Sequence, residues 1–357
     1  KYWRRCLDAI LQALQTWVKH EHISRKPRHQ ASRVADTRWV MKWKHEQAAT
    51  SVKDMRAGKK ADTQRIVRAR LTLRGFKDME NNDIARYAGT SARSSQRVLV
   101  SEAARRNWGI CATDIAKAFL QVVTYEEIAK LTGEPEREVN FYLPPHNVAM
   151  LRTLPGRKDF DPHTEIIHSD KSGTGLVDAP RAFSIKLKPV TGEECQLRSS
   201  LIDLELCFKV DYSDRNKPEV VMYMTKHVDD LKLCGPRHAI LKVTATLEKH
   251  FGALKVTWHH FTNCGVQHIH CERNKHISPD QETYIQNMRR ISHSSLTNAS
   301  PETECCPKLH QLCMPLLGAV AYASQTRVDA LVFICAPRQH NAKPLIEHHR
   351  RLNELLK

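Results

Sequence analysis

The stretch that most constrains the fold is a β-rich run at residues 220–225 that leads into two adjacent carboxylates, Asp229 and Asp230. The run is enriched in β-branched and aromatic residues, and Gly235-Pro236 interrupts the chain soon afterwards. This pattern predicts a strand, a turn and a return strand. Successive side chains of a strand point to opposite faces, so two neighbouring aspartates converge only at a hairpin tip. A third carboxylate from elsewhere would complete a site for divalent cations.

A second acidic position lies at the end of another apolar run. Residues 109–113 read Gly-Ile-Cys-Ala-Thr and lead into Asp114, after which the chain continues to Ala118-Phe119-Leu120. A carboxylate at the end of a buried strand is costly unless it binds a partner. Asp114 is therefore either a ligand-binding residue or a salt-bridged or capping aspartate.

The charge balance suggests a polyanionic partner. Lys and Arg together number 56 against 39 Asp and Glu, a net charge of +17, which favours nucleic acid first and an anionic membrane second. Arg68, Arg70 and Arg74 alternate along residues 65–76, so their guanidinium groups share one face of a predicted strand and can bind phosphates. The alternatives are a solvated basic surface and an edge strand protected by charge.

Length and cysteine usage restrict the class of protein. A chain of 357 residues can form two or three subdomains, and no apolar run approaches the roughly 18 residues of a membrane span. The absence of an initiator Met suggests a fragment of a longer protein. Eleven cysteines without a Cys-x-x-Cys pair fit reduced intracellular thiols. The spacing of Cys264, His268, His270 and Cys271 matches no structural zinc pattern.

Periodicity and breakers predict a mixed helix and sheet protein. Helices are expected at residues 1–20, 94–108, 125–137, 179–183, 239–251, 277–285, 317–322, 330–334 and 345–356, and strands at 38–44, 65–76, 109–113, 139–143, 220–225 and 261–266. Residues 20–33 and 292–306 are expected to be linkers, and residues 46–62 and 146–171 loops. The N-terminal helix has one apolar face and is expected to pack on a partner segment.

Taken in order, these motifs resemble the reverse transcriptase of copia-type long-terminal-repeat retrotransposons over residues 33–357. The matching blocks are Thr37-Arg38-Trp39-Val40, Ala69-Arg70-Leu71 with Arg74-Gly75-Phe76, Asp114-Ile115 with Ala118-Phe119-Leu120, Gly175-Leu176 with Ala179-Pro180-Arg181-Ala182-Phe183, Val228-Asp229-Asp230-Leu231, Phe261 with Gly265-Val266, Gln281 with Tyr284-Ile285, and Gln325-Thr326-Arg327 with Asp329.

The resemblance implies an α+β fold of the right-handed polymerase type, with fingers, palm and thumb subdomains and an antiparallel palm sheet backed by helices. An N-terminal helix and basic linker would occupy residues 1–32, the fingers and palm residues 33–235, and the end of the palm, the thumb and the start of a connection residues 236–357. The implied function is RNA-directed DNA polymerase, which transfers a nucleotide from a deoxynucleoside triphosphate to a primer 3′-hydroxyl.

The resemblance also assigns roles to residues. Asp114 would join Asp229 and Asp230 as the third catalytic carboxylate, and with the carbonyl of Ile115 they would bind two Mg²⁺ ions, with Mn²⁺ as an alternative. The nucleotide-binding residues would be Arg68, Arg70, Phe119 and Gly175, with Phe119 as the aromatic gate against a ribose 2′-hydroxyl. The residues for template and primer would be Arg74, Pro180, Arg181 and His227.

The implied partners are an RNA template, a DNA primer, their RNA–DNA hybrid, deoxynucleoside triphosphates, and the integrase and ribonuclease H domains of a polyprotein, upstream and downstream respectively; no membrane partner is expected. The expected location is intracellular, in cytoplasmic particles and the nucleus. Departures from the family pattern include His227 for a usual Tyr and Val177-Asp178 for a usual Lys-Gln pair, and Asp178 is expected to hinder template binding. They leave a second hypothesis open, a catalytically decayed nucleic-acid-binding remnant.

Overall fold

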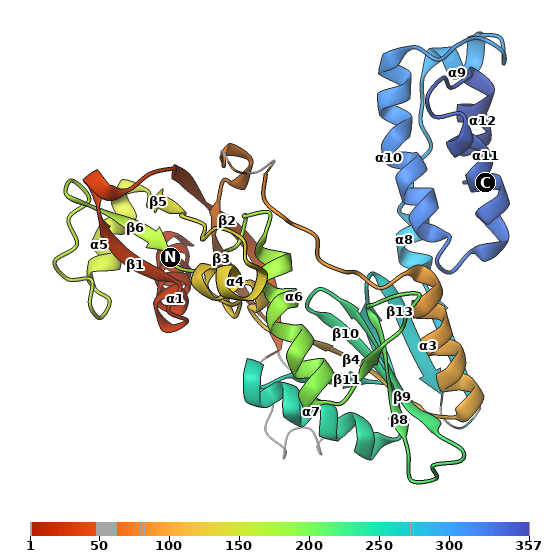
Figure 1. The fold of residues 1–357 in the computed structure, drawn as a ribbon. Coiled ribbons are helices and arrows are strands. Elements are labelled where there is room, and N and C mark those ends of the chain that lie inside the picture. The colour runs from red at the N-terminus through yellow and green to blue at the C-terminus, as the bar shows by residue number, and fades with distance from the viewer. Residues whose placement is uncertain are drawn as a thin grey trace. The chain divides into compact units, whose positions relative to one another are not determined.

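The computed structural model describes residues 2–47, 63–78, 80, 83–271, 273 and 275–356, and it is a mixed helix and sheet structure, as the sequence predicts (Figure 1). Its helices are α1 (Tyr2–Lys19), α3 (Arg93–Arg106), α4 (Tyr125–Thr132), α5 (Pro145–Arg152), α6 (Ala179–Pro189), α7 (Arg237–Phe251), α8 (Glu282–Gln286), α9 (Ser294–Asn298), α10 (Pro307–Ala323), α11 (Leu331–Gln339) and α12 (Ile346–Glu354). Its strands are β1 (Ile23–Pro27), β2 (Val34–Gln47), β3 (Thr63–Leu73), β4 (Gly109–Asp114), β5 (Asn140–Tyr142), β6 (Glu165–Ser169), β7 (Arg198–Ser199), β8 (Leu206–Asp211), β9 (Glu219–His227), β10 (Asp230–Gly235), β11 (Lys255–Trp258), β12 (His260–Asn263), β13 (Val266–Cys271) and β14 (His276–Asp280).

The chain folds into two compact units. The first contains residues 1–90, 115–197 and 245–254, and the second contains residues 91–114, 198–244 and 255–357. Among the described residues, no helix is both long enough and apolar enough to cross a bilayer.

The first unit contains a sheet with the strand order β1-β6-β5-β2-β3. Strands β2 and β3 pair antiparallel along their whole length. On β3 the side chains of Leu71 and Leu73 are buried, which leaves Arg68 and Arg70 on the opposite face, as the alternation predicts. Helix α1 packs against β3 and α5, and its buried Trp17 contacts the ring of Phe141 edge-on. The middle and C-terminal part of the apolar face of α1, with Ile10, Leu14 and Trp17, is thus buried within its own chain, whereas Trp3 near the N-terminus is exposed.

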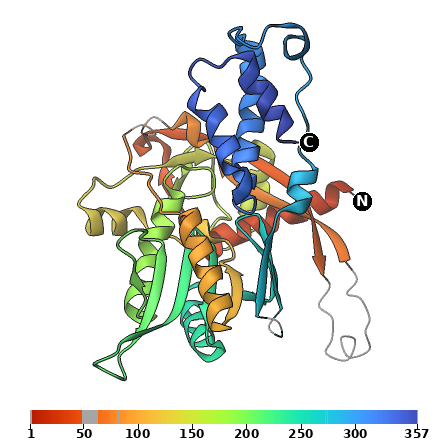
Figure 2. The same cartoon turned by 90° about the vertical axis from the view of Figure 1, so that its right-hand side faces the viewer.

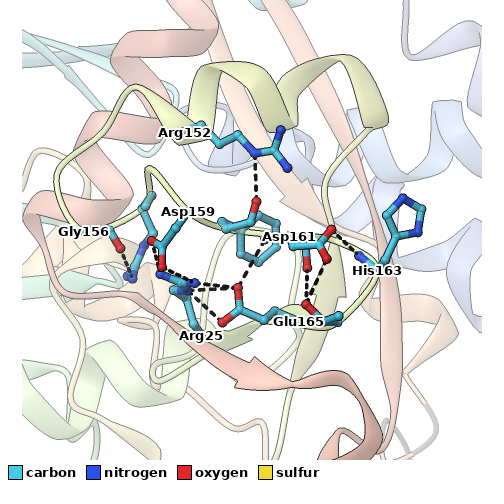
Figure 3. Close-up of polar contacts among 10 residues, drawn as sticks. Arg25, Arg152, Gly156, Asp159, Asp161, His163 and Glu165 are labelled. Atoms are coloured by element: carbon cyan, nitrogen blue, oxygen red, sulfur yellow. Dashed lines mark hydrogen bonds and ion pairs between the residues drawn. The ribbon is translucent and has the colours of Figure 1, made fainter.

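Two parts of the first unit differ from the sequence-based expectation. Residues 23–27 are not a linker, because they form β1 and pair antiparallel with β6. The expected loop at residues 146–171 contains most of α5 and all of β6. Arg25 of β1 holds this segment by ion pairs to Asp159 (2.7 Å) and Glu165 (2.6 Å), and Figure 3 shows its guanidinium between the two carboxylates. The predicted loop at residues 46–62 lies largely outside the described residues.

The second unit contains an antiparallel sheet with the strand order β11-β4-β10-β9-β8-β7. Helix α3 packs on this sheet, and Leu99 and Ala103 of the helix share an apolar cluster with Ile110 of β4 and Cys234 of β10. Figure 2 shows α3 in orange along the green strands. Because β10 lies between β4 and β9, its side chains are among the most deeply buried of the sheet.

The remainder of the second unit is a three-stranded sheet, β12-β13-β14, and a group of helices. Residues 277–279 belong to strand β14 rather than to a helix, and only the short α8 follows them. Pro279 is tolerated there because β14 is an edge strand of this sheet. Helices α10, α11 and α12 enclose their own apolar cluster, which includes Leu309, Ile334 and Leu352.

Candidate functional site

The structure brings Asp114 and Asp230 directly opposite each other. They are paired residues of the antiparallel strands β4 and β10, and residues paired in this way have Cα atoms about 4.5–5.5 Å apart. Asp230 is also opposite His227 of β9. The two aspartates are far apart in the sequence, but they lie side by side at the same end of the neighbouring strands β4 and β10.

Asp229 lies in the turn that joins β9 to β10. This turn has two residues, Val228 and Asp229, between the paired ends His227 and Asp230, which confirms the predicted hairpin. Val228 has φ of +59°, a left-handed conformation that is unfavourable for a β-branched residue. Backbone strain of this kind is typical of functional sites, and here it is localised next to the acidic pair.

Three carboxylates influence one another at this end of the sheet. Burial raises the pKa of Asp230 above its ordinary value, and the negative charges of Asp229 and Asp114 raise it further, while His227 acts in the opposite direction. Asp114 is exposed and Asp230 is half-buried. The arrangement therefore combines a desolvated carboxyl group with two like charges.

The donor set suits a hard divalent cation, since Mg²⁺ binds carboxylate oxygens and retains waters and substrate phosphates in its shell. In the described part of the chain, no three His, Cys, Asp or Glu side chains are already arranged around a metal position. Asp114, Asp229 and Asp230 are thus not grouped around a metal position either, and metal binding by them stays a prediction. Ile115, the expected carbonyl ligand, directly follows Asp114, and its side chain is fully buried.

A buried lysine lies two residues after Asp230, and sequence analysis missed it. Lys232 is 2% exposed, and burial lowers its pKa to about 8. Its Nζ lies 3.2 Å from Nε2 of His268 on β13, whose Nδ1 is 3.0 Å from the carbonyl oxygen of Val266. Burial lowers the pKa of His268 to about 3, so the neutral ring can donate from Nδ1 and accept from Lys232. The only signal in the sequence was a lysine inside an apolar strand.

The residues predicted to bind the nucleotide all belong to the first unit, whereas the three aspartates belong to the second. Arg68 lies on the open face of β3, near enough to Lys117 to lower its pKa. Phe119 is half-buried in a short 3₁₀ turn that follows Lys117. The nucleotide-binding roles of Arg68 and Phe119 stay predictions.

Gly175 has a packing role that its sequence context did not reveal. Its φ is +101°, and a Cβ atom there would lie 2.2 Å from the carbonyl oxygen of Leu73. The neighbouring carbonyl of Thr174 accepts a hydrogen bond of 2.9 Å from the N–H of Leu73. The glycine therefore lets this loop approach the backbone of β3, whatever it does toward a ligand.

The residues predicted to contact template and primer are distributed over both units. A guanidinium nitrogen of Arg74 lies 3.6 Å from a carboxylate oxygen of Asp36, and Pro180 is in the first turn of α6. Arg181 donates two hydrogen bonds of 2.8 Å to the carboxylate of Glu134, so part of its guanidinium is engaged within the chain. His227 belongs to the second unit, opposite Asp230.

The departure at Asp178 has a structural explanation. Its carboxylate is buried, forms an ion pair with Arg137 and accepts a hydrogen bond of 2.6 Å from the hydroxyl of Ser172. Arg137 is itself buried and also pairs with Asp78 and Glu80. The carboxylate of Asp178 is thus engaged with Arg137 inside the first unit, and its expected effect on template binding stays a prediction.

Comparisons with known proteins give structural similarity only. No protein-family model matches the sequence, and no curated protein matches it. Among solved structures, the chain is similar to a foamy viral protease-reverse transcriptase in complex with double-stranded DNA, at 12% identity and a TM-score of 0.45 over 98% of this chain and 47% of that one. It is also similar to telomerase from Candida albicans in complex with a telomeric RNA fragment, at 10% identity and a TM-score of 0.42 over 93% of this chain and 57% of that one. The chain thus spans about half the length of these solved proteins.

Proposed function

We propose that the chain is an RNA-directed DNA polymerase, the reverse transcriptase of a retrotransposon. Its active site would lie in the second unit, at the end of strands β4 and β10 that carries Asp114 and Asp230. The pairing of Asp114 with Asp230, beside Asp229 in the turn, carries this proposal. In the right-handed polymerase fold proposed here, the sheet with strands β4, β9 and β10 is the palm, the first unit contributes the fingers, and helices α10–α12 form the thumb.

The three aspartates would hold the catalytic cations. Asp114, Asp229 and Asp230 would hold them by their carboxylates, and the carbonyl of Ile115 is a further proposed donor. Two Mg²⁺ ions, or Mn²⁺ in their place, would supply Lewis acidity for attack by the primer 3′-hydroxyl and for departure of pyrophosphate. Burial raises the pKa of Asp230, and the charges of Asp229 and Asp114 raise it further. A bound cation would favour the charged carboxylate against all three effects, which supports this assignment.

The other proposed roles concern positioning. Arg68 and Arg70 would bind the phosphates of the incoming deoxynucleoside triphosphate by charge-assisted hydrogen bonds. Phe119 would exclude a ribose 2′-hydroxyl by its bulk, and Gly175 would position the loop that faces the nucleotide. Arg74, Pro180, Arg181 and His227 would contact the RNA template, the DNA primer or their hybrid.

Primer extension on an RNA template with deoxynucleotides and Mg²⁺ tests the proposal. Asp229→Asn keeps the size of the side chain but removes its charge, and it is expected to lower the extension rate at least about 100-fold, since charge stabilisation in the transition state is worth that much or more. Asp214→Asn is the matched control, because Asp214 is exposed in the loop between β8 and β9. Full activity of Asp229→Asn would refute the assigned mechanism.

A catalytically decayed remnant is the second candidate, and His227 opposite Asp230 is the observation that favours it. Such a protein would bind RNA–DNA hybrid with an affinity that falls as salt rises, but it would not extend a primer with either metal. His227→Tyr would then be expected to restore measurable extension if this single position caused the loss.

A further inference from the structure

Several basic side chains converge at the C-terminal end of α1 in the first unit. Lys171 donates a hydrogen bond of 2.9 Å to the carbonyl of His20, just after the helix, and the ammonium of Lys117 lies 3.2 Å from the hydroxyl of Thr16. These contacts bring two segments that are distant in sequence to the last turn of α1. The result is a cluster, called here the α1 basic cluster, whose members are Lys19, His20, Lys117, Lys171 and Lys186.

The members of the α1 basic cluster repel one another. Burial lowers the pKa of His20, and the positive charges of Lys117, Lys171, Lys19 and Lys186 lower it further. The pKa of Lys117 is likewise lowered by burial first and then by Arg68 and Lys19. Among the described residues, Glu127 acts in the opposite direction on one member, because its charge raises the pKa of Lys186. Burial and Lys171 outweigh it there, and the cluster as a whole carries an excess of positive charge.

Capping of the helix explains only part of this arrangement. A cation near the last carbonyl groups of a helix is stabilising, and Lys171 fills that role through its bond to His20. One such cation suffices for a cap. Burial lowers the pKa of both Lys117 and Lys186, and neighbouring positive charges lower both further. A bound anion would favour the charged form of each lysine.

We propose that the α1 basic cluster binds a phosphate chain. Ammonium groups from separate segments can surround successive phosphates, and the charge of Arg68 on β3 also acts on Lys117. The ligand is either the polyphosphate of a nucleoside triphosphate or the backbone of a nucleic-acid strand, since both present the same chemistry. The inference rests on the proposed function for the identity of the ligand, and it adds a role for residues 16–20, which lie outside the stretch that resembles reverse transcriptases.

Binding of inorganic tripolyphosphate, without metal and at low salt, tests the site itself. The full chain is titrated by calorimetry, and the variants are Lys19→Gln and Lys117→Gln, which remove one charge each. Each variant is expected to weaken binding by up to about 5-fold, because one ion pair at an exposed site is worth about 0.2–1 kcal/mol. Lys158→Gln is the matched control, since Lys158 is an exposed lysine of the same unit outside the cluster, and it should bind like the wild type.

A second arm distinguishes the two sources of phosphate. Single-stranded RNA is titrated over a salt series, and for a strand-binding cluster Lys19→Gln should reduce the slope of log K against log salt by about 0.7. If the cluster is instead a triphosphate site, Lys19→Gln should leave the salt slope for RNA unchanged and lower the affinity for tripolyphosphate. Either pattern supports a phosphate site.

Equal binding of both ligands by the wild type, the two cluster variants and Lys158→Gln would overturn the inference, as would no binding of either ligand at low salt. Asp229→Asn separates this result from the proposed function. It should lose primer extension yet bind tripolyphosphate normally, so a failure of catalysis and a failure of the phosphate site give different outcomes.

Discussion

Asp114 and Asp230 are directly opposite each other on the neighbouring strands β4 and β10, at the same end of the two strands. Like charges in this position destabilise an antiparallel pair. Burial is the main cause of the raised pKa of Asp230, and the charges of Asp229 and then Asp114 add to it. A carboxyl group whose pKa is raised on folding reduces stability above its ordinary pKa. The penalty is therefore present at neutral pH and disappears as the pH falls below the ordinary range of an aspartate.

Asp230→Asn is accordingly expected to raise the melting temperature at pH 7 in the absence of divalent cations, because it removes one of the repelling charges. Mg²⁺ should raise the melting temperature of the wild type, since it binds the folded state, and should raise that of the variant less. Differential scanning calorimetry with and without Mg²⁺ measures both effects. A lower melting temperature for the metal-free variant would contradict the view that the site is electrostatically strained.

Lys232→Met is expected to stabilise the protein at neutral pH. Burial lowers the pKa of Lys232 from 10.5 to about 8, which corresponds to about 3 kcal/mol of unfavourable free energy for the charged form. The variant loses the hydrogen bond to His268, worth about 1 kcal/mol, so the net gain should be about 2 kcal/mol at pH 7.

The pH dependence provides the sign check for this prediction. Between pH 8 and 10.5 the unfolded chain holds the Lys232 proton and the folded chain does not, so the wild type gains stability as the pH rises. The advantage of Lys232→Met in urea unfolding should therefore be larger at pH 7 than at pH 9.5. Lys308→Met, at an exposed position, should show no such trend, and an equal advantage at both pH values would argue against a charged Lys232 in the core.

The buried ion cluster around Arg137 should be essential to the first unit. Arg137→Met would leave Asp78, Glu80 and Asp178 without their shared cation, and breaking a buried pair in this way costs about 3–5 kcal/mol. Asp178→Asn should lower the free energy of unfolding less, because Arg137 still pairs with the carboxylates of Asp78 and Glu80. Chemical denaturation of both variants measures the order, and a greater loss for Asp178→Asn would contradict it.

The sequence was sufficient to predict the hairpin that carries Asp229 and Asp230, because alternation and a short turn are local properties. The pairing of Asp114 with Asp230 follows from long-range strand register, which local patterns do not determine, and it was expected only through the family resemblance. Lys232 was missed because a lysine in a strand usually has a solvent-exposed side chain, whereas β10 is a central strand of its sheet. The α1 basic cluster was missed because its members are isolated lysines in segments that only the tertiary fold brings together.

Tyr322 and Gly265 form a tight contact whose energetic coupling can be measured. The hydroxyl of Tyr322, on α10, donates to the carbonyl of Cys264 in the turn between β12 and β13. The next residue, Gly265, has φ of +72°, and a Cβ atom there would lie 1.9 Å from the Tyr322 oxygen. Gly265→Ala must therefore displace the tyrosine and also adopt a left-handed conformation, which costs roughly 1–2 kcal/mol by itself.

Tyr322→Phe removes the oxygen that the new methyl group would meet, at the loss of a hydrogen bond worth about 1 kcal/mol. The double variant Gly265→Ala/Tyr322→Phe should thus be less destabilised than the sum of the two single variants, by at least about 1 kcal/mol, as for other residues in direct contact. Urea unfolding of the four proteins gives this coupling energy. Strict additivity would show that the turn and α10 do not meet in solution as they do here, whereas a positive coupling would confirm that this contact anchors α10 to the β12–β13 hairpin.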